Sequence, residues 1–107
     1  MIDVREYVDA RGHNHFRDWT SKQDPSVRVR IDKAVFRLGE GNFSAVKPEG
    51  EGVSALRLDF GPGYRVYFTV EGRSVVLLFC GGDKTTQPKD IRRAREYLVD
   101  YRRRTDA

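Results

Sequence analysis

The sequence predicts a small α+β domain in which helices pack a mainly antiparallel sheet, with the element order β-α-α-β-β-β-α. Its 107 residues suffice for one hydrophobic core and not for two. Apolar residues recur at helical spacing in residues 15–38 and again in residues 88–101, whereas residues 53–70 alternate with a period of two. We therefore expect one α+β domain over residues 1–107.

The first strand and the first helix are predicted from short patterns. Residues 2–8 alternate loosely between apolar and polar side chains, which is typical of an edge strand. Residues 15–22 carry Phe16 and Trp19 at helical spacing, which indicates a short helix. We expect both aromatic side chains in the core rather than on a surface that stacks on nucleic-acid bases.

A second helix is predicted with clear ends. Asp24 suits its N-cap and Pro25 its first turn. Gly39 and Gly41 are expected to end it. Its apolar stripe consists of Val27, Ile31, Ala34, Val35 and Leu38. Residues 42–52 are polar and rich in glycine, so we interpret them as a loop.

Three strands and a final helix are predicted in the second half. Residues 53–60 and 64–70 alternate, as expected for strands with one apolar face. Residues 75–80 (VVLLFC) are apolar throughout, which indicates a strand that is covered on both faces. Pro88 is expected to begin the last helix. Its apolar stripe consists of Ile91, Ala94, Leu98 and Tyr101.

The stretch FGPGYRVYF, residues 60–68, predicts a β-hairpin that carries polar side chains on one face. Counting outward from a loop at residues 61–63, the expected opposed pairs are Phe60–Tyr64, Asp59–Arg65 and Arg57–Tyr67. One interpretation is an ordinary hairpin, in which a cross-strand ion pair of Asp59 with Arg65 contributes about 0.2–1 kcal/mol. The other is a hairpin whose polar face binds a ligand.

The stretch CGGDKTTQPKD, residues 80–90, favours the ligand-binding interpretation. An aspartate and a lysine follow the end of the central strand, and loops held by a rigid scaffold commonly carry binding and catalytic residues. Three cations and a phenol gathered at one end of a sheet suit a phosphodiester. The candidate site then consists of Arg57, Arg65, Tyr67, Asp83 and Lys84.

The excess positive charge lies at the end of the chain. Residues 1–83 contain twelve basic and twelve acidic side chains, whereas residues 84–107 contain eight basic and four acidic ones. A basic surface of this kind either attracts phosphates or is a solvated helix face, and the count alone does not separate the two. The net charge of the whole chain is +4.

The cysteine and histidine content argues against disulfides and metals. The lone Cys80 excludes an internal disulfide and is expected in the core, which suits the reducing cytoplasm. No membrane-length apolar run or signal-peptide pattern is present in the sequence. His13 and His15 suggest two metal ligands, but no third ligand has a suitable spacing, so we expect no metal and no cofactor.

Two segments together carry a family resemblance. LRLDFGPGYRVYF, residues 56–68, and LLFCGGDKTTQPKDIRRAREYL, residues 77–98, resemble the RelE/ParE toxin superfamily, most closely the HigB-like, phage-derived addiction module killer proteins. The element order matches over residues 16–101. The resemblance implies a microbial-RNase-like α+β fold and a toxin of a bacterial type II toxin–antitoxin pair. Many such toxins cleave mRNA on the ribosome without a metal, whereas the ParE-like branch inhibits DNA gyrase.

The resemblance also implies partners and residue roles. The expected partners are a cognate antitoxin, usually a helix-turn-helix protein that forms a hetero-oligomer with the toxin, and the ribosome with its mRNA. Arg57 matches the basic residue on the strand before the hairpin, and Arg65 matches the arginine of the G-Y-R turn. Lys84, with Asp83 beside it, matches the basic residue after the central strand.

The chain departs from this family at two positions. Ile91 stands where several ribonuclease members carry a tyrosine or histidine, and Ala55 stands where relatives commonly carry an acid. A metal-free ribonuclease needs a base for the 2′-hydroxyl, positive charge on the phosphorane and an acid for the 5′-oxygen. Tyr67 and Asp83 are candidate bases. Lys84 or a tyrosine would act near pH 7 only with a lowered pKa, which neighbouring arginines would favour.

Overall fold

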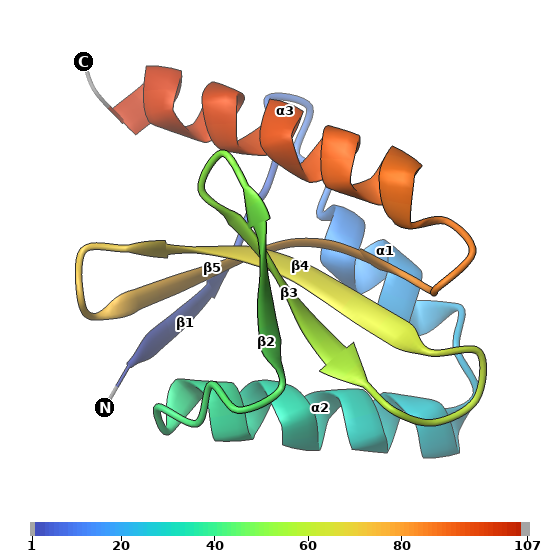
Figure 1. Cartoon of the computed structure of the whole chain (residues 1–107). Helices are drawn as coiled ribbons and strands as arrows, with labels where there is room; N and C mark the ends of the chain where they lie inside the picture. The colour runs from blue at the N-terminus through green and yellow to red at the C-terminus, as the bar shows by residue number, and fades with distance from the viewer. Residues whose placement is uncertain (1, 106–107) are drawn as a thin grey trace.

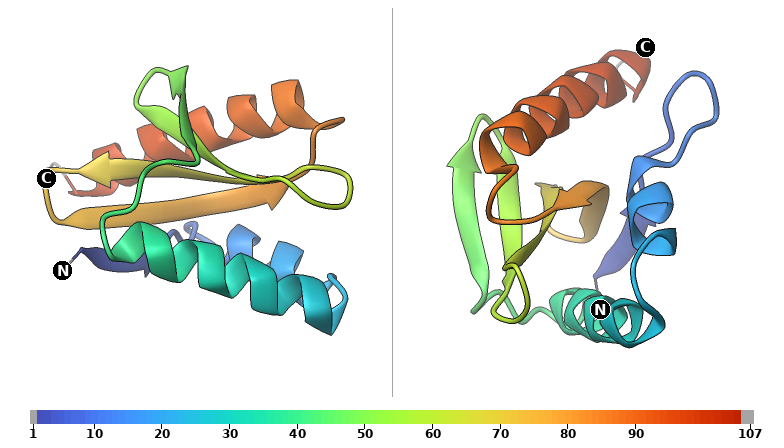
Figure 2. Two further views of the ribbon diagram at one scale, coloured as in Figure 1. Left: turned by 60° about the horizontal axis from the view of Figure 1, so that its bottom comes forward. Right: turned by 90° about the vertical axis from the view of Figure 1, so that its right-hand side faces the viewer.

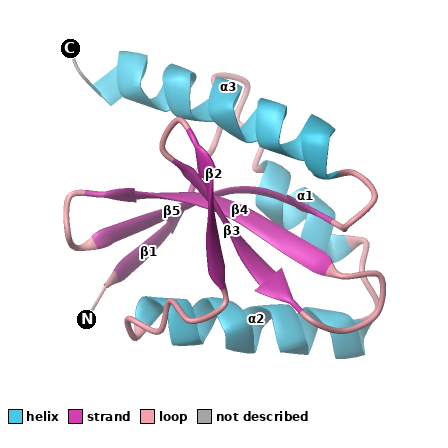
Figure 3. Cartoon of the chain, in the orientation of Figure 1, coloured by secondary structure: helices cyan, strands magenta, loops and turns pink. Residues whose placement is uncertain are grey.

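The computed structural model describes residues 2–105, which form a five-stranded mixed sheet and three helices (Figure 1, Figure 3). The elements are β1 (Asp3–Glu6), α1 (His15–Ser21), α2 (Pro25–Gly39), β2 (Val46–Gly50), β3 (Val53–Leu58), β4 (Tyr64–Glu71), β5 (Val75–Gly82) and α3 (Gln87–Thr105). The strand order is β1-β5-β4-β3-β2, with β1 parallel to β5 and the other neighbours antiparallel. The predicted α+β class is confirmed.

The sheet separates two layers of helix (Figure 2). On the side of α1 and α2, the buried cluster contains Phe16, Ile31, Leu38, Leu56, Leu58, Val66, Phe68, Val76 and Leu78. On the side of α3, it contains Tyr7, Val53, Ala55, Tyr67, Leu77, Phe79, Cys80, Ala94 and Leu98. Residues 76–79 of β5 thus alternate between the two cores, which confirms that this strand is covered on both faces, and the alternation ends at Cys80, where the register with β4 shifts.

The three predicted helices form, and α2 begins and ends where expected. The side chain of Asp24 accepts a hydrogen bond from the backbone N–H of Ser26 and caps α2. Asn14 caps α1 in the same way, by accepting from the backbone N–H of Arg17. The final helix begins at Gln87, one residue before the predicted start. None of the three helices, within residues 2–105, is long and apolar enough to cross a bilayer.

The interpretation of residues 42–52 as a loop is wrong, because they contain the edge strand β2 (Val46–Gly50), which pairs antiparallel with β3. The register shifts between Pro48 and Gly50. A segment that contains a proline and lacks a period of two does not resemble a strand, so its pattern did not predict one. The β2–β3 turn has positive φ angles at Gly50, Glu51 and Gly52.

The predicted register of the β3–β4 hairpin is also wrong. The last pair of the ladder is Leu58–Tyr64, so residues 59–63 form a five-residue loop in place of three. Two tight turns close it: the N–H of Phe60 donates to the carbonyl of Leu58, and the N–H of Gly63 donates to the carbonyl of Phe60. Positive φ angles at Gly61 and Gly63 permit these turns.

The longer loop shifts the hairpin pairs by two residues. Arg57 lies directly opposite Arg65, and Tyr67 lies opposite Ala55. Asp59 belongs to the exposed loop and pairs with neither arginine, so the expected cross-strand ion pair does not form. The division of the two faces is nevertheless as predicted, because a shift of two residues preserves the alternation.

Candidate functional site

Two arginines occupy opposed positions on neighbouring strands. Arg57 and Arg65 are direct cross-strand partners, on the sheet face opposite to that of Leu56 and Leu58. Neither arginine forms an ion pair with any other residue in the part of the chain that the structure describes. Because like charges directly opposite each other destabilise a sheet, folding alone does not account for this pair.

The hairpin tip holds the Arg65 guanidinium in place. Its Nη1 donates to the backbone carbonyls of Gly63 (3.0 Å) and Tyr64 (3.1 Å). Its Nε is buried and has no hydrogen-bond partner among the described residues. A buried donor without a partner is destabilising, and a phosphate oxygen is a natural acceptor for a guanidinium.

Lys84 reaches the same hairpin tip from the segment between β5 and α3. A Cβ atom placed on Gly63 would lie 3.3 Å from the Cβ of Lys84 and 3.4 Å from Nη1 of Arg65. The structure therefore brings the side chains of Arg65 and Lys84 next to the same glycine. We call Arg57, Arg65 and Lys84 the basic patch.

Tyr67 lies below the surface of this patch. Its side chain is fully buried in the core cluster that faces α3, beside Ala94 and Leu98. Burial raises the pKa of the Tyr67 phenol, and the nearby Asp90 carboxylate adds to the shift. The hydroxyl has no hydrogen-bond partner within residues 2–105. The expectation of a lowered tyrosine pKa is wrong for Tyr67, whose position makes it a poor proton acceptor near neutral pH.

Asp83 is engaged in the turn before α3. Its carboxylate accepts hydrogen bonds from the backbone N–H of Thr85 (2.8 Å) and from the Thr85 hydroxyl (2.6 Å). These bonds lower the pKa of the Asp83 carboxyl. The carboxylate is therefore a weak base, and its visible role is to shape the turn that carries Lys84.

Asp90 is a buried acid that the sequence pattern did not predict as part of the site. It lies on the first turn of α3, next to Ile91, and is 4% exposed. Burial raises the pKa of the Asp90 carboxyl, although the hydrogen bond from the Thr86 hydroxyl opposes the shift. The carboxylate packs against Gly82, which is the cross-strand partner of Arg65. The signal for Asp90 in the sequence was the pair Gly81-Gly82, followed by Thr86 and Asp90 four residues apart.

The glycine pair at the end of β5 is explained by packing on both faces. A Cβ on Gly81 would overlap the indole ring of Trp19, and a Cβ on Gly82 would overlap the carboxylate of Asp90. Trp19 is half-buried and packs with the α1–α2 core, which agrees with the predicted core role. Phe16 and Cys80 are buried as predicted.

A basic groove adjoins the patch on the side of α2. The groove has a volume of about 240 Å³, and its walls include Arg30 and Arg37 of α2 together with Arg57 and Asp59. The guanidinium carbon of Arg30 lies 3.6 Å from the centroid of the Phe60 ring. Neither α2 arginine is a candidate from the sequence pattern, because both approach Arg57 only when α2 packs beside β3 in the folded chain.

Comparison with known proteins identifies a relative of this chain. No protein-family model matches the chain. An uncharacterized protein of Haemophilus influenzae (strain Rd) is 42% identical over 81 residues, which cover 75% of this chain and 82% of the relative. The chain therefore belongs to the same family as this Haemophilus influenzae protein.

Proposed function

We propose that the protein is the toxin of a type II toxin–antitoxin module and acts as a ribosome-dependent, metal-independent mRNA endoribonuclease. The observation that carries this proposal is the uncompensated Arg57–Arg65 pair, with Lys84 at the same hairpin tip. The resemblance of residues 56–98 to the RelE/ParE superfamily supports it. This activity would place the protein in the bacterial cytoplasm.

In this mechanism the substrate supplies its own nucleophile. The 2′-hydroxyl releases its proton to water as its oxygen attacks the adjacent phosphorus and the bond from phosphorus to the 5′-oxygen breaks, leaving a 2′,3′-cyclic phosphate and a 5′-hydroxyl. Arg57 and Arg65 would bind the nonbridging oxygens as negative charge accumulates on them. Lys84 would share this charge or donate the proton that the 5′-oxygen takes up.

The groove beside α2 extends the positive surface from Arg57 to Arg30 and Arg37. Arg30 and Arg37 would pair with flanking phosphates and contribute affinity without reading the bases. A site with strong charge stabilisation and weak bases is a poor catalyst by itself. Dependence on the ribosome to orient the mRNA is consistent with this composition.

A second candidate function is non-catalytic inhibition of DNA gyrase, as in the ParE-like branch. The observation that favours it is the state of the two candidate bases. Tyr67 is buried with a raised pKa, and hydrogen bonds lower the pKa of Asp83. In this case the basic patch would bind a protein or DNA surface.

Induction of the chain alone in bacteria separates the two functions. For the endoribonuclease, incorporation of labelled amino acids falls before incorporation of labelled thymidine, and primer extension detects new 5′ ends within ribosome-bound mRNA. The variant Arg57→Ala/Arg65→Ala produces neither effect. If thymidine incorporation falls first and the mRNA stays intact, the gyrase function replaces the endoribonuclease.

The proposal includes a cognate antitoxin, expected to be a helix-turn-helix protein encoded beside the toxin. Coexpression of the two neighbouring genes should restore growth and yield a complex that survives size-exclusion chromatography. If the neighbouring product neither restores growth nor copurifies, it is not the antitoxin.

A further inference from the structure

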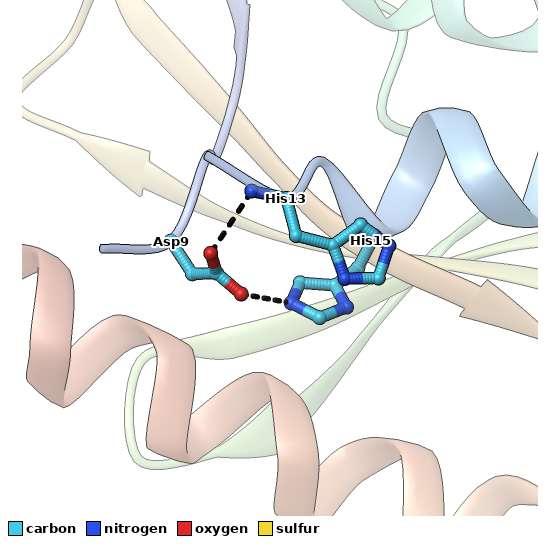
Figure 4. A group of neighbouring side chains, drawn as sticks. All are labelled: Asp9, His13 and His15. Carbon is cyan, nitrogen blue, oxygen red and sulfur yellow. Dashed lines mark hydrogen bonds and ion pairs between the residues drawn. The ribbon is translucent and has the colours of Figure 1, made fainter. Parts of the chain in front are cut away.

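We propose that Asp9, His13 and His15 form a binding site for a divalent transition-metal ion such as Zn²⁺. These residues offer one carboxylate oxygen and two imidazole nitrogens, and the ligand atoms all lie within 4.8 Å of one another. Figure 4 shows the Asp9 carboxylate directed at the His15 ring, with the His13 ring beside it. Asp9 is thus the third ligand that the sequence spacing did not reveal.

The loop between β1 and α1 holds the three ligand residues close together before any ion binds. The Asp9 carboxylate accepts hydrogen bonds from the backbone N–H groups of Arg11 and His13, both at 2.9 Å. The backbone N–H of Asp9 donates to the carbonyl of His13, and Gly12 adopts the positive φ angle that the loop requires. These bonds close the loop on itself, so little ordering remains to be done when a metal binds.

Both ends of this loop are anchored to the rest of the molecule. The His15 ring stacks on Tyr97 of α3, with centroids 4.5 Å apart and planes 14° apart. At the preceding residue, the Asn14 side chain donates to Glu6, and Arg17 forms a two-point ion pair with the same glutamate. His15 is therefore held from outside the loop, whereas the His13 side chain is half exposed and can adjust.

Small movements of the side chains would bring the three ligand atoms to the distances found around a bound zinc ion. Ligand atoms around a tetrahedral Zn²⁺ lie about 3.4 Å apart, given bonds of about 2.1 Å. The distance from Asp9 Oδ2 to His15 Nε2 is 2.8 Å, so this pair opens slightly when the ion replaces the shared proton. Rotation of the exposed His13 side chain closes the remaining distances. A water molecule would supply the fourth ligand, because Asp18, 3.8 Å from the His13 Nε2, is paired with Lys22.

The donor set selects the class of ion. Two imidazoles and a single carboxylate suit Zn²⁺, Cu²⁺ or Ni²⁺, whereas Mg²⁺ and Ca²⁺ require more oxygen ligands. The proposed ion would tie the loop to the start of α1 and stabilise that corner. The site is separate from the basic patch. His15 stacks on Tyr97, whereas Arg65 lies opposite Gly82, which contacts Asp90 seven residues, about 10 Å, earlier along α3.

The composition of the chain makes a binding test easy to interpret. The chain contains two histidines, both in this cluster, and its lone cysteine is buried. After removal of any affinity tag and treatment with EDTA, the full chain is titrated with ZnCl₂ by calorimetry, and its melting temperature is measured with and without the ion. We expect one Zn²⁺ per chain, a higher melting temperature with Zn²⁺ and no binding of Mg²⁺.

Three variants assign the ligands. His13→Ala and His15→Gln should each weaken Zn²⁺ binding roughly tenfold or more. Arg11→Ala serves as the control, because it lies in the same loop and uses only its backbone N–H. NMR signals of both imidazole rings should shift on addition of one equivalent of Zn²⁺. Absence of binding to the wild-type chain, or equal affinity in folded His13→Ala and His15→Gln variants, would overturn the site.

Discussion

Arg57 and Arg65 face each other across β3 and β4 without a carboxylate between them. A five-residue hairpin loop creates this relationship, because it moves Asp59 out of the ladder and into solvent. Two guanidinium groups in this arrangement repel each other in the free protein and are relieved by an anion that binds both. The proposed RNA cleavage depends on this relationship.

Arg65→Ala should abolish toxicity and leave the protein folded. If its guanidinium stabilises charge on the phosphorane, its loss removes about 3–4 kcal/mol of transition-state stabilisation, a rate loss of about a hundredfold or more. The assay is cleavage of ribosome-bound mRNA, with the melting temperature measured in parallel. Asp59→Ala should retain most activity, because Asp59 pairs with no arginine in the hairpin. A folded Arg65→Ala protein that cleaves at the wild-type rate would make the hairpin an ordinary structural element.

Arg57→Thr should raise the free energy of unfolding by a few tenths of a kcal/mol at low ionic strength, because it removes like-charge repulsion from a cross-strand pair. The gain should shrink in 1 M salt, where screening already weakens the repulsion. Urea unfolding at both salt concentrations measures the difference. The control is Arg73→Thr in the exposed β4–β5 turn, which should change stability little in either condition. A destabilised Arg57→Thr would show that Arg57 has a stabilising contact.

Gly82→Ala should destabilise the fold by about 1–3 kcal/mol, because the new methyl group overlaps the buried Asp90 carboxylate. The same substitution in an Asp90→Ala background should be milder, since the carboxylate is then gone. Urea unfolding of the four proteins gives the coupling free energy. Additive effects would mean that Asp90 is not the group that requires glycine at this position.

Asp90→Asn should make the protein more stable at neutral pH. The ordinary Asp90 pKa is 3.8 and burial raises it in the folded chain, so the folded state binds this proton more tightly. The carboxyl therefore favours folding most below pH 3.8, and stability decreases as pH rises from there through the folded-state pKa. The asparagine side chain keeps an acceptor for Thr86 and carries no charge, so that decrease should be smaller in the variant. The free energy of unfolding of both proteins, measured across this pH range, tests the prediction. An Asp90→Asn protein that is less stable than the wild type at pH 7 would contradict it.

Cys80 should be unreactive toward a disulfide reagent such as DTNB in the folded protein. Burial raises the pKa of the Cys80 thiol to about 12, so almost no thiolate exists at pH 8. Labelling should reach completion at once in denaturant and proceed under native conditions only as the chain opens. Fast native labelling would show that the β5–α3 contact opens readily.

The prediction of single elements from the sequence succeeded where the signal is local. The Asp24-Pro25 start, the apolar stripe of α2 and the uninterrupted apolar run of β5 each report on a few adjacent residues. Strand β2 was missed because Pro48 interrupts its pattern, so that only its pairing with β3 defines it. The hairpin register was missed for a related reason: a loop of three and a loop of five residues leave the same alternation on both strands.

The α+β class, the three helices, the two ends of α2 and the choice of Arg57, Arg65 and Lys84 as candidates all follow from the sequence, because propensity, capping and periodicity act over a few residues. Three features follow only from the folded chain: Arg57 faces Arg65, α3 covers Tyr67 and Asp90, and Asp9 lies beside both histidines. These features depend on pairing register, on burial and on a folded loop. Each brings together groups whose surroundings and partners are set by neighbours distant in the chain or by the exact course of the backbone.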